Sequence, residues 1–180
     1  MKKKNMRNRA LVAAAATLVV AAAAVLWLTW PNSTTLTGYA ARGDLAGVRR
    51  SLRLGVDPNK ASRYGFRAEN EGQTPLTAAA ESGRKEVISL LLERGADPNL
   101  RDFGADHPHD TPLSTAARAG HADVCLVLLN AGADPNLPTH PGQPGDPGNW
   151  TALDWALQGN HTAVAALLRA HGAVESGRRR

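Results

Sequence analysis

One pattern returns four times along this 180-residue chain, at intervals of 40, 37 and 40 residues. Each copy opens with a threonine, and nine residues later comes a glycine or an asparagine, the types that most readily adopt the left-handed backbone that ends a helix. Another glycine follows twelve residues after that. Each copy therefore predicts two short helices, each ended by its own stop residue, and then a turn. The opening threonine is expected to cap the first helix with its hydroxyl. The opening threonines are Thr34, Thr74, Thr111 and Thr151.

The second helix of each copy has an apolar stripe, as in the helically spaced residues Val87, Ile88, Leu91 and Leu92. One helix pair cannot bury such a stripe alone, so neighbouring copies must stack. The chain is 43% hydrophobic but contains few aromatic residues, so its core must be built from Leu, Val and Ala, which pack well between helices. The single cysteine, Cys125, lies in a stripe and is expected to be an ordinary core residue.

The openings resemble the ankyrin repeat family, whose Thr-Pro-Leu-His-x-Ala motif is approached at residues 74–79 and 111–116. His121 and His161 also stand at the family's Gly-His position. The resemblance spans four units from Thr34 to Val174, and it implies an all-α ankyrin solenoid of helix-turn-helix units. It also implies a protein without enzymatic activity that binds a protein partner through its concave face.

The terminal copies depart from the motif, because Thr35 and Ala152 replace its proline. These units are expected to cap the stack. Trp155 stands where other copies have a small residue, and we expect its ring to cover the open end. The motif's histidine is replaced in every copy, by Thr37, Thr77, Ser114 and Asp154.

Three long loops separate the copies, and they exceed a 33-residue period by seven, four and seven residues. We call them fingers 1, 2 and 3, at residues 60–73, 100–110 and 137–150. Such insertions map to one face, so the fingers should project side by side from the concave edge.

The family pattern also indicates which residues contact a partner. They are those just before each threonine, those just before each helix stop, and the aromatic residues of the fingers. The expected partner-binding residues are Gln73, Asp110, Trp150, Glu81, Ser82, Arg118, Gln158, Tyr64, Phe66 and Phe103.

Catalytic motifs are not found, and no cofactor is expected. The strongest metal candidate is the run from Asp106 to Asp110 in finger 2, which contains His107 and His109 and could hold zinc. A proline between the two histidines gives poor preorganisation, so an exposed polar loop is the preferred interpretation and no metal site is predicted. A metal-dependent enzyme using this finger remains a remote alternative.

The net charge of +5 comes from the chain ends, since residues 31–177 carry a net charge of −3. A nucleic-acid partner is therefore not expected. Within the repeats, residues 42–67 carry +5 and residues 68–177 carry −8. Two interpretations stay open: these are solvated faces, or the basic end faces anionic lipid while the acidic end meets a partner.

Residues 10–30 are uncharged and, as a helix, are about 31 Å long, which matches a bilayer core. With the basic residues 1–9 before it, this segment is expected to be a transmembrane signal-anchor of the inner membrane. Cleavage as a signal peptide, leaving a soluble periplasmic protein, is the main alternative, and a buried globular helix is the third. The Ala-rich composition, with more Arg than Lys, suggests a bacterial source.

These features predict a basic cytoplasmic segment at 1–9, a membrane segment at 10–30, a periplasmic ankyrin domain at 31–177 and a basic tail at 178–180. The expected function is to bind a periplasmic or membrane protein. An inhibitor or immunity-type protein that blocks a periplasmic enzyme is the alternative.

Overall fold

The computed structural model describes residues 33–62, 72–103, 109–139 and 150–176. Within these ranges the chain forms eight helices and no strand. None of these eight helices is long and apolar enough to cross a membrane. The expected membrane segment at 10–30 and the N-terminal helix predicted there lie outside the described residues.

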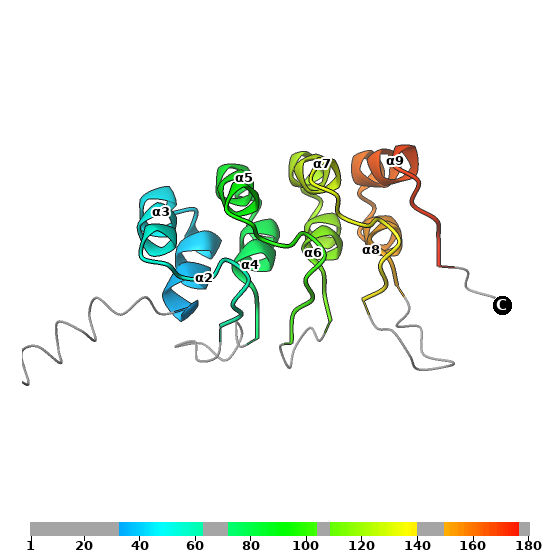
Figure 1. Ribbon diagram of the computed structural model, residues 1–180. Coiled ribbons are helices and arrows are strands. Elements are labelled where there is room, and N and C mark those ends of the chain that lie inside the picture. The colour runs from blue at the N-terminus through cyan, green and yellow to red at the C-terminus, as the bar shows by residue number, and fades with distance from the viewer. Residues whose placement is uncertain (1–32, 63–71, 104–108, 140–149, 177–180) are drawn as a thin grey trace, which may run out of the picture. The chain divides into compact units, whose positions relative to one another are not determined.

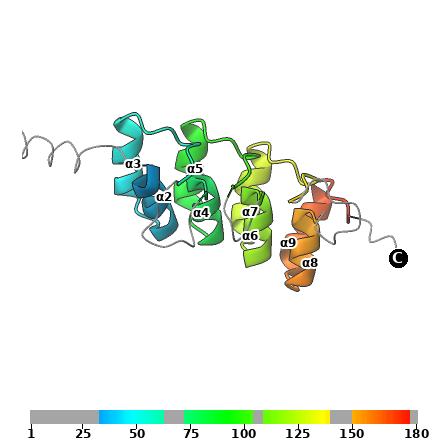
Figure 2. The same cartoon turned by 90° about the horizontal axis from the view of Figure 1, so that it is seen from below.

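The eight helices form four consecutive pairs. In Figure 1 the first helices of the pairs lie in one row and the second helices in another, and Figure 2 shows the pairs following one another in chain order. This arrangement confirms the predicted solenoid of four units over the described residues. The pairs are α2 (Ser33–Arg42) with α3 (Leu45–Arg53), α4 (Pro75–Glu81) with α5 (Lys85–Glu93), α6 (Pro112–Ala119) with α7 (Ala122–Asn130), and α8 (Ala152–Gln158) with α9 (Thr162–Ala170).

The predicted stop residues all have the backbone that their positions require. Gly43, Gly83 and Gly120 have φ between 66° and 79°, and Asn160 takes the same left-handed region with φ of 57°. Each residue lies between the first and second helix of its unit. The substitution of asparagine for glycine in the last unit is therefore conservative in conformation.

Two of the opening threonines cap their helices as predicted. The hydroxyl oxygen of Thr74 accepts the Thr77 amide at 3.1 Å, and that of Thr111 accepts the Ser114 amide at 3.1 Å. Ser114, at the motif's histidine position, in turn accepts the Thr111 amide at 2.9 Å. These replacements of histidine thus bond within their own unit.

The terminal units start differently. In α8 the carboxylate of Asp154 accepts both the amide and the hydroxyl of Thr151, at 2.8 and 2.9 Å. In the first unit α2 already begins at Ser33, so the prediction that Thr34 caps this helix is wrong. A proline at the first helical position keeps the residue before it out of the helix, and Thr35 imposes no such restriction.

The core runs continuously through the four units. Leu residues at equivalent positions of the four first helices are at most 2% exposed: Leu36, Leu76, Leu113 and Leu153. The second helices add buried residues from the predicted stripes, such as Leu91, Leu128 and Leu168. Cys125 is fully buried among them, and burial raises the pKa of its thiol to about 12, so it is a core residue as predicted.

The Asp-Pro-Asn turns link each unit to the next. Asp97 accepts the amide of Asn99 at 2.8 Å, which holds the asparagine in place. Asn99 then reaches the next unit twice, since its Nδ2 donates to the Gly132 carbonyl at 3.1 Å and its Oδ1 accepts the Asp134 amide at 2.8 Å. Asn59 and Asn136 make the same pair of bonds one unit earlier and one unit later.

We expect Asn99→Ala to lower the free energy of unfolding by about 1–2 kcal/mol, because both inter-unit hydrogen bonds are lost together. Asn130→Ala is the matched control, since Asn130 is exposed at the end of α7. Urea unfolding of the two variants measures the difference. Equal stability of Asn99→Ala and Asn130→Ala would show that the turn bonds contribute nothing.

The C-terminal segment packs against the start of α8 at the last unit. The hydroxyl of Ser176 donates to Asp154 at 2.6 Å, and the Val174 amide is held by Asn136. Trp155 does not cover the open end, as its size had suggested, because Arg118 of the preceding unit lies over its ring. Trp155 instead faces the neighbouring repeat.

Candidate partner-binding surface

The three fingers are closed at equivalent positions by backbone hydrogen bonds. The amides of Ser62, Asp102 and Thr139 each donate, at 2.9 Å, to the carbonyl of the residue just before the next threonine. Fingers 1 and 2 also meet directly, since the Phe103 amide donates to the Gly72 carbonyl at 3.0 Å. The finger bases therefore stand in a row beside the first helices (Figure 1).

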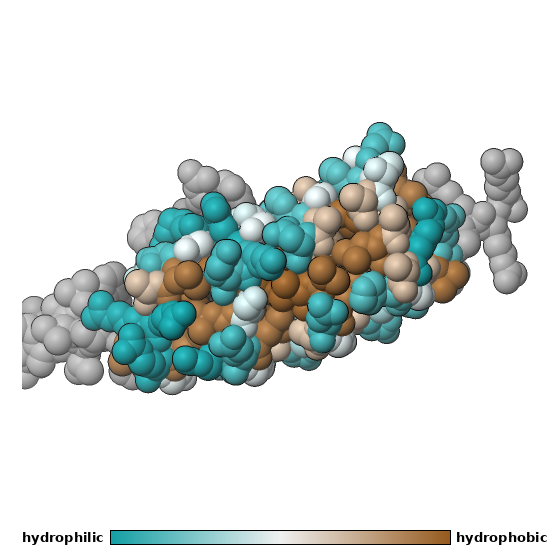
Figure 3. Space-filling model, turned by 90° about the horizontal axis from the view of Figure 1, so that it is seen from above, coloured by the Kyte–Doolittle hydropathy of each residue, from teal (hydrophilic) through white to brown (hydrophobic). Residues whose placement is uncertain are grey.

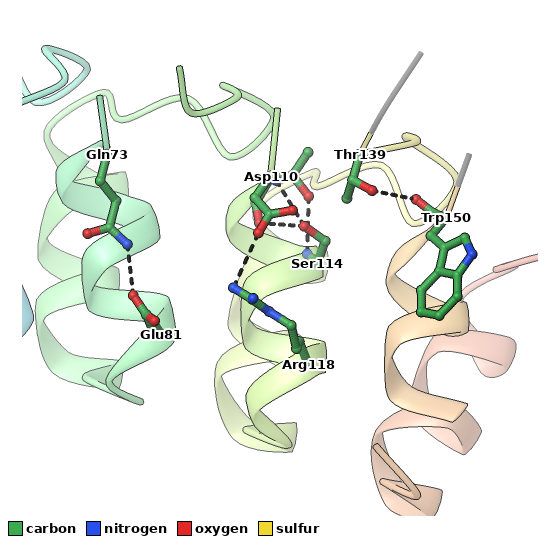
Figure 4. Close-up of polar contacts among 8 residues, drawn as sticks. Gln73, Glu81, Asp110, Ser114, Arg118, Thr139 and Trp150 are labelled. Atoms are coloured by element: carbon green, nitrogen blue, oxygen red, sulfur yellow. Dashed lines mark hydrogen bonds and ion pairs between the residues drawn. The ribbon is translucent and has the colours of Figure 1, made fainter. Parts of the chain in front are cut away.

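The finger bases and the accessible C-terminal ends of α4, α6 and α8 form what we call the first-helix surface. In two successive units, a side chain at the finger base bonds to a side chain in the last turn of the first helix that follows it. Gln73 Nε2 donates to Glu81 Oε2 at 2.8 Å, and Arg118 pairs with Asp110 at 3.2 Å (Figure 4). The structure thus brings four of the predicted partner-binding residues together in pairs.

Asp110 differs from its prediction, because it is only 3% exposed and does not belong to the accessible surface. Its carboxylate instead holds the half-exposed Arg118 guanidinium. Asp110 lies directly before the N-cap of α6, where backbone hydrogen bonds with Asp102 close the base of finger 2, and Arg118 lies in the last turn of the same helix. Asp110 thus positions a surface residue.

Arg118 also belongs to an aromatic cluster at the last two units. Its guanidinium carbon lies 5.5 Å from the centre of the Trp155 ring, a cation–π distance. Trp155 meets Trp150 edge to face, with ring centres 4.7 Å apart and an interplanar angle of 64°. We call Asp110, Arg118, Trp150 and Trp155 the Trp150 cluster.

The sequence prediction missed Trp155 as a member of this surface. It is half-buried on α8, and its indole Nε1 has no hydrogen-bond partner among the described residues. The signal was available, because Trp155 follows Trp150 by five residues and replaces a small residue of the earlier copies. The size of its ring predicts a place at the end of the stack, whereas its ring contacts Arg118 of α6.

A second missed residue is Asp102, at the base of finger 2. It is 4% exposed, and its carboxylate accepts the Thr74 amide at 2.9 Å, which joins finger 2 to the start of α4. Its pKa is raised from 3.8 to about 7, mainly by burial and also by the nearby Asp110 carboxylate, while hydrogen bonds from Thr74 and Thr77 oppose the shift. A carboxylate that titrates near neutral pH therefore lies beneath the first-helix surface.

In the second, third and fourth units, the residue after the helix stop hydrogen-bonds a backbone carbonyl at the first helix of the preceding unit. Nε2 of His121 donates to the Glu81 carbonyl at 3.1 Å, and Nε2 of His161 donates to the Arg118 carbonyl at 3.0 Å. Arg84 occupies the same position in the second unit, and its Nε donates to the Ala41 carbonyl at 3.4 Å. The histidines at the family's Gly-His position thus have a structural role, and Arg84 fills the same role in the second unit.

The other predicted partner-binding residues do not belong to the two pairs or to the Trp150 cluster. Phe103 is 70% exposed at the base of finger 2, Gln158 is exposed at the end of α8, and Ser82 is half-buried after α4. Tyr64 and Phe66 lie outside the described residues. On the first-helix surface, the Trp150 cluster thus combines an ion pair, a cation–π contact and a contact between two aromatic rings. Phe103 adds an exposed apolar side chain on the neighbouring finger.

The metal candidate is only partly described, because Asp106, His107 and Pro108 lie outside the described residues. His109 is described, and its φ of 73° places it in the left-handed region. Among the residues that the structure describes, no group of three or more His, Cys, Asp or Glu side chains is arranged to hold a metal ion.

A family model described as ankyrin repeats, in three copies, matches residues 11–102, 36–139 and 103–177. The chain belongs to the ankyrin repeat family. Ankyrin repeats are protein-interaction modules and are typically without enzymatic activity, so a protein partner is implied. In this ankyrin array, the stop residues end the helices, and the histidines and turn asparagines hydrogen-bond one repeat to the next.

Individual relatives match shorter stretches. Over 67 residues the chain is 42% identical to cyclin-dependent kinase 4 inhibitor B of Bos taurus, covering 37% of this chain and 45% of that protein. Over 70 residues it is 33% identical to the 2-5A-dependent ribonuclease of Mus musculus, covering 39% of this chain and 9% of that protein. The chain thus spans less than half the length of these relatives.

Proposed function

We propose that this ankyrin array binds a protein partner through its concave, first-helix surface, with the Trp150 cluster as the main contact. The observation that carries the proposal is the arrangement of Trp150, Trp155 and Arg118, in which two aromatic rings and a guanidinium are held together at a finger base. Rigid aromatic and arginine side chains lose little entropy on binding and dominate interface energies. Asp110 restrains Arg118 before any partner arrives.

We expect Trp150→Ala to weaken partner binding by about 2 kcal/mol, or roughly 30-fold in Kd. The same change should cost only about 1 kcal/mol of folding stability, the value of an edge-to-face ring contact. Proteins captured from membranes by the full chain identify the partner, and titration calorimetry then gives the affinity of each variant.

The control is Leu126→Ala, because Leu126 is 42% exposed on α7, a second helix. It removes an exposed apolar side chain away from the first-helix surface. Equal affinities for Trp150→Ala and the wild type would place the interface elsewhere. Severe unfolding of Trp150→Ala would mean that this ring belongs to the core.

We further propose that residues 10–30 tether the array to the inner membrane of a bacterium, with residues 1–9 in the cytoplasm and the repeats in the periplasm. The support is the uncharged length of the segment and the basic residues before it. A periplasm-active reporter fused after Arg180 should be active. The mass of the purified native protein separates the tethered form from one cleaved near Val25.

An inhibitory outcome is the second candidate, favoured by the similarity to a relative named as a kinase inhibitor. In that case the partner is an exported enzyme, and binding blocks it. Adding the purified chain to the captured partner distinguishes the two possibilities, because an inhibitor lowers the partner's activity in proportion to the fraction bound, whereas a scaffold leaves it unchanged.

A further inference from the structure

The outer side of α3, at the first unit, combines positive charge with an exposed apolar residue. Ala46, Arg50, Arg53 and Leu54 line one shallow, open hollow, so these four side chains share a face. Arg50, Arg53 and Leu54 follow Ala46 by four, seven and eight residues, which is the spacing of residues on one face of a helix. Val48 and Ser51 are buried on the other side of the helix.

Within the part of the chain that the structure describes, the arginines of this face have no ion-pair partner. Arg49, Arg50 and Arg53 are all exposed, and no carboxylate of the described residues forms an ion pair with any of the three. The nearby Asp44 accepts the Gly47 amide at the opposite end of α3. Figure 3, which looks onto the second helices, shows hydrophilic surface gathered at this end of the array and more apolar surface further along.

A purely structural explanation covers only part of this face. Arginines in the last turn of a helix interact favourably with its dipole, which accounts for Arg50 and Arg53. It does not account for Leu54, which is 55% exposed directly beside them. Basic side chains around an exposed apolar side chain are the composition of helix faces that lie on anionic bilayers.

We propose that the α3 face, formed by Ala46, Arg49, Arg50, Arg53 and Leu54, docks on the anionic phospholipid headgroups of a membrane. The arginines attract the phosphates, and Leu54 enters the boundary between headgroups and acyl chains. This inference rests on the tether in the proposed function, because α2 begins at Ser33, only three residues after Trp30 in the sequence.

The charge distribution favours lipid over nucleic acid as the anionic partner. The basic face is confined to the first unit, while residues 68–177 carry a net charge of −8. A long polyanion lying along the array would meet repulsion from these later repeats. A flat anionic surface that touches only the end of the array would not.

The test attaches an environment-sensitive fluorophore at the N-terminal end of the α3 face in the full chain, through Ala46→Cys. Cys125 is fully buried and its thiol pKa is raised to about 12, so the label goes to position 46 alone. The labelled chain is reconstituted in vesicles of phosphatidylcholine, with or without phosphatidylglycerol. We expect a blue shift of the emission only with phosphatidylglycerol, and its loss at high salt.

Charge reversal identifies the residues responsible. Arg50→Glu with Arg53→Glu should abolish the blue shift, whereas Lys85→Glu with Arg94→Glu, an equal change at exposed positions of the second unit, should keep it. Circular dichroism checks that each variant is folded. The proposal is overturned if the two lipid compositions give the same emission, if both double variants behave alike, or if a DNA duplex shifts the emission and phosphatidylglycerol does not.

Flotation of the same vesicles separates this proposal from the tether. A chain that floats with neutral vesicles and shows no blue shift with phosphatidylglycerol retains its tether and refutes docking by the α3 face. A chain that floats only with anionic vesicles, and shows the shift there, supports the α3 face and refutes the tether.

Discussion

Asp102→Asn is expected to make this protein more stable than the wild type at pH 8, by roughly 2–4 kcal/mol, and to change little at pH 4. Asp102 is buried at the base of finger 2, and its pKa is raised from 3.8 to about 7. Asparagine retains an oxygen to accept the Thr74 amide, but it carries no charge that must be desolvated. The variant therefore keeps the contact and removes its electrostatic cost.

The sign follows from proton binding. Between pH 4 and pH 7 the folded protein binds more protons at Asp102 than the unfolded chain does, so folding stability falls as the pH rises through this window. Any pH dependence that arises outside Asp102 is common to both proteins. The informative quantity is therefore the difference in unfolding free energy between Asp102→Asn and the wild type, and it should grow with pH.

Urea unfolding of the full chain in mild detergent, from pH 4 to pH 8, measures this difference. Asp123→Asn is the control, because it makes the same change of side chain at an exposed position, in the first turn of α7. A constant difference across the range, or a variant that is less stable at pH 8, would contradict a buried charge at Asp102.

Leu128→Ala should lower the free energy of unfolding by roughly 2–5 kcal/mol, through lost apolar burial and the cavity left behind. Leu128 is fully buried on α7, where stacked second helices pack against it on both sides. Thermal unfolding measures the loss. Leu126→Ala, on the exposed side of the same helix, should cost far less, and equal losses for the two would show that the stripe is not the core.

Much of the fold could be predicted because its signals are local. The helix stops need a left-handed backbone, which glycine and asparagine adopt more readily than other residues. A proline at the first helical position restricts the backbone of the residue before it. These preferences act within a few residues, so the sequence alone located the helices of the later units. Where the proline is absent, at Thr35, the predicted start of the helix was wrong.

The candidate site was less predictable because its contacts join distant parts of the chain. Asp110, Arg118 and Trp150 lie at finger bases and at a helix end, where the pattern placed them, but the contacts that they make were not predicted. Trp155 meets an arginine from the preceding unit, and Asp102 bonds an amide 28 residues away. Neither contact leaves a periodic signal, since no other copy carries the same side chains at those positions.

The sequence by itself determined the repeat, the positions where helices end, and the apolar stripes that make the units stack, since each depends on backbone preference or helical periodicity. Only the tertiary structure decided that Asp102 and Asp110 are buried, that Trp155 faces the neighbouring repeat, and that Arg118 is held over its ring. The physical reason is that desolvation and side-chain pairing depend on which units lie side by side. A charged residue has the same local sequence signal whether a neighbouring repeat covers it or water does.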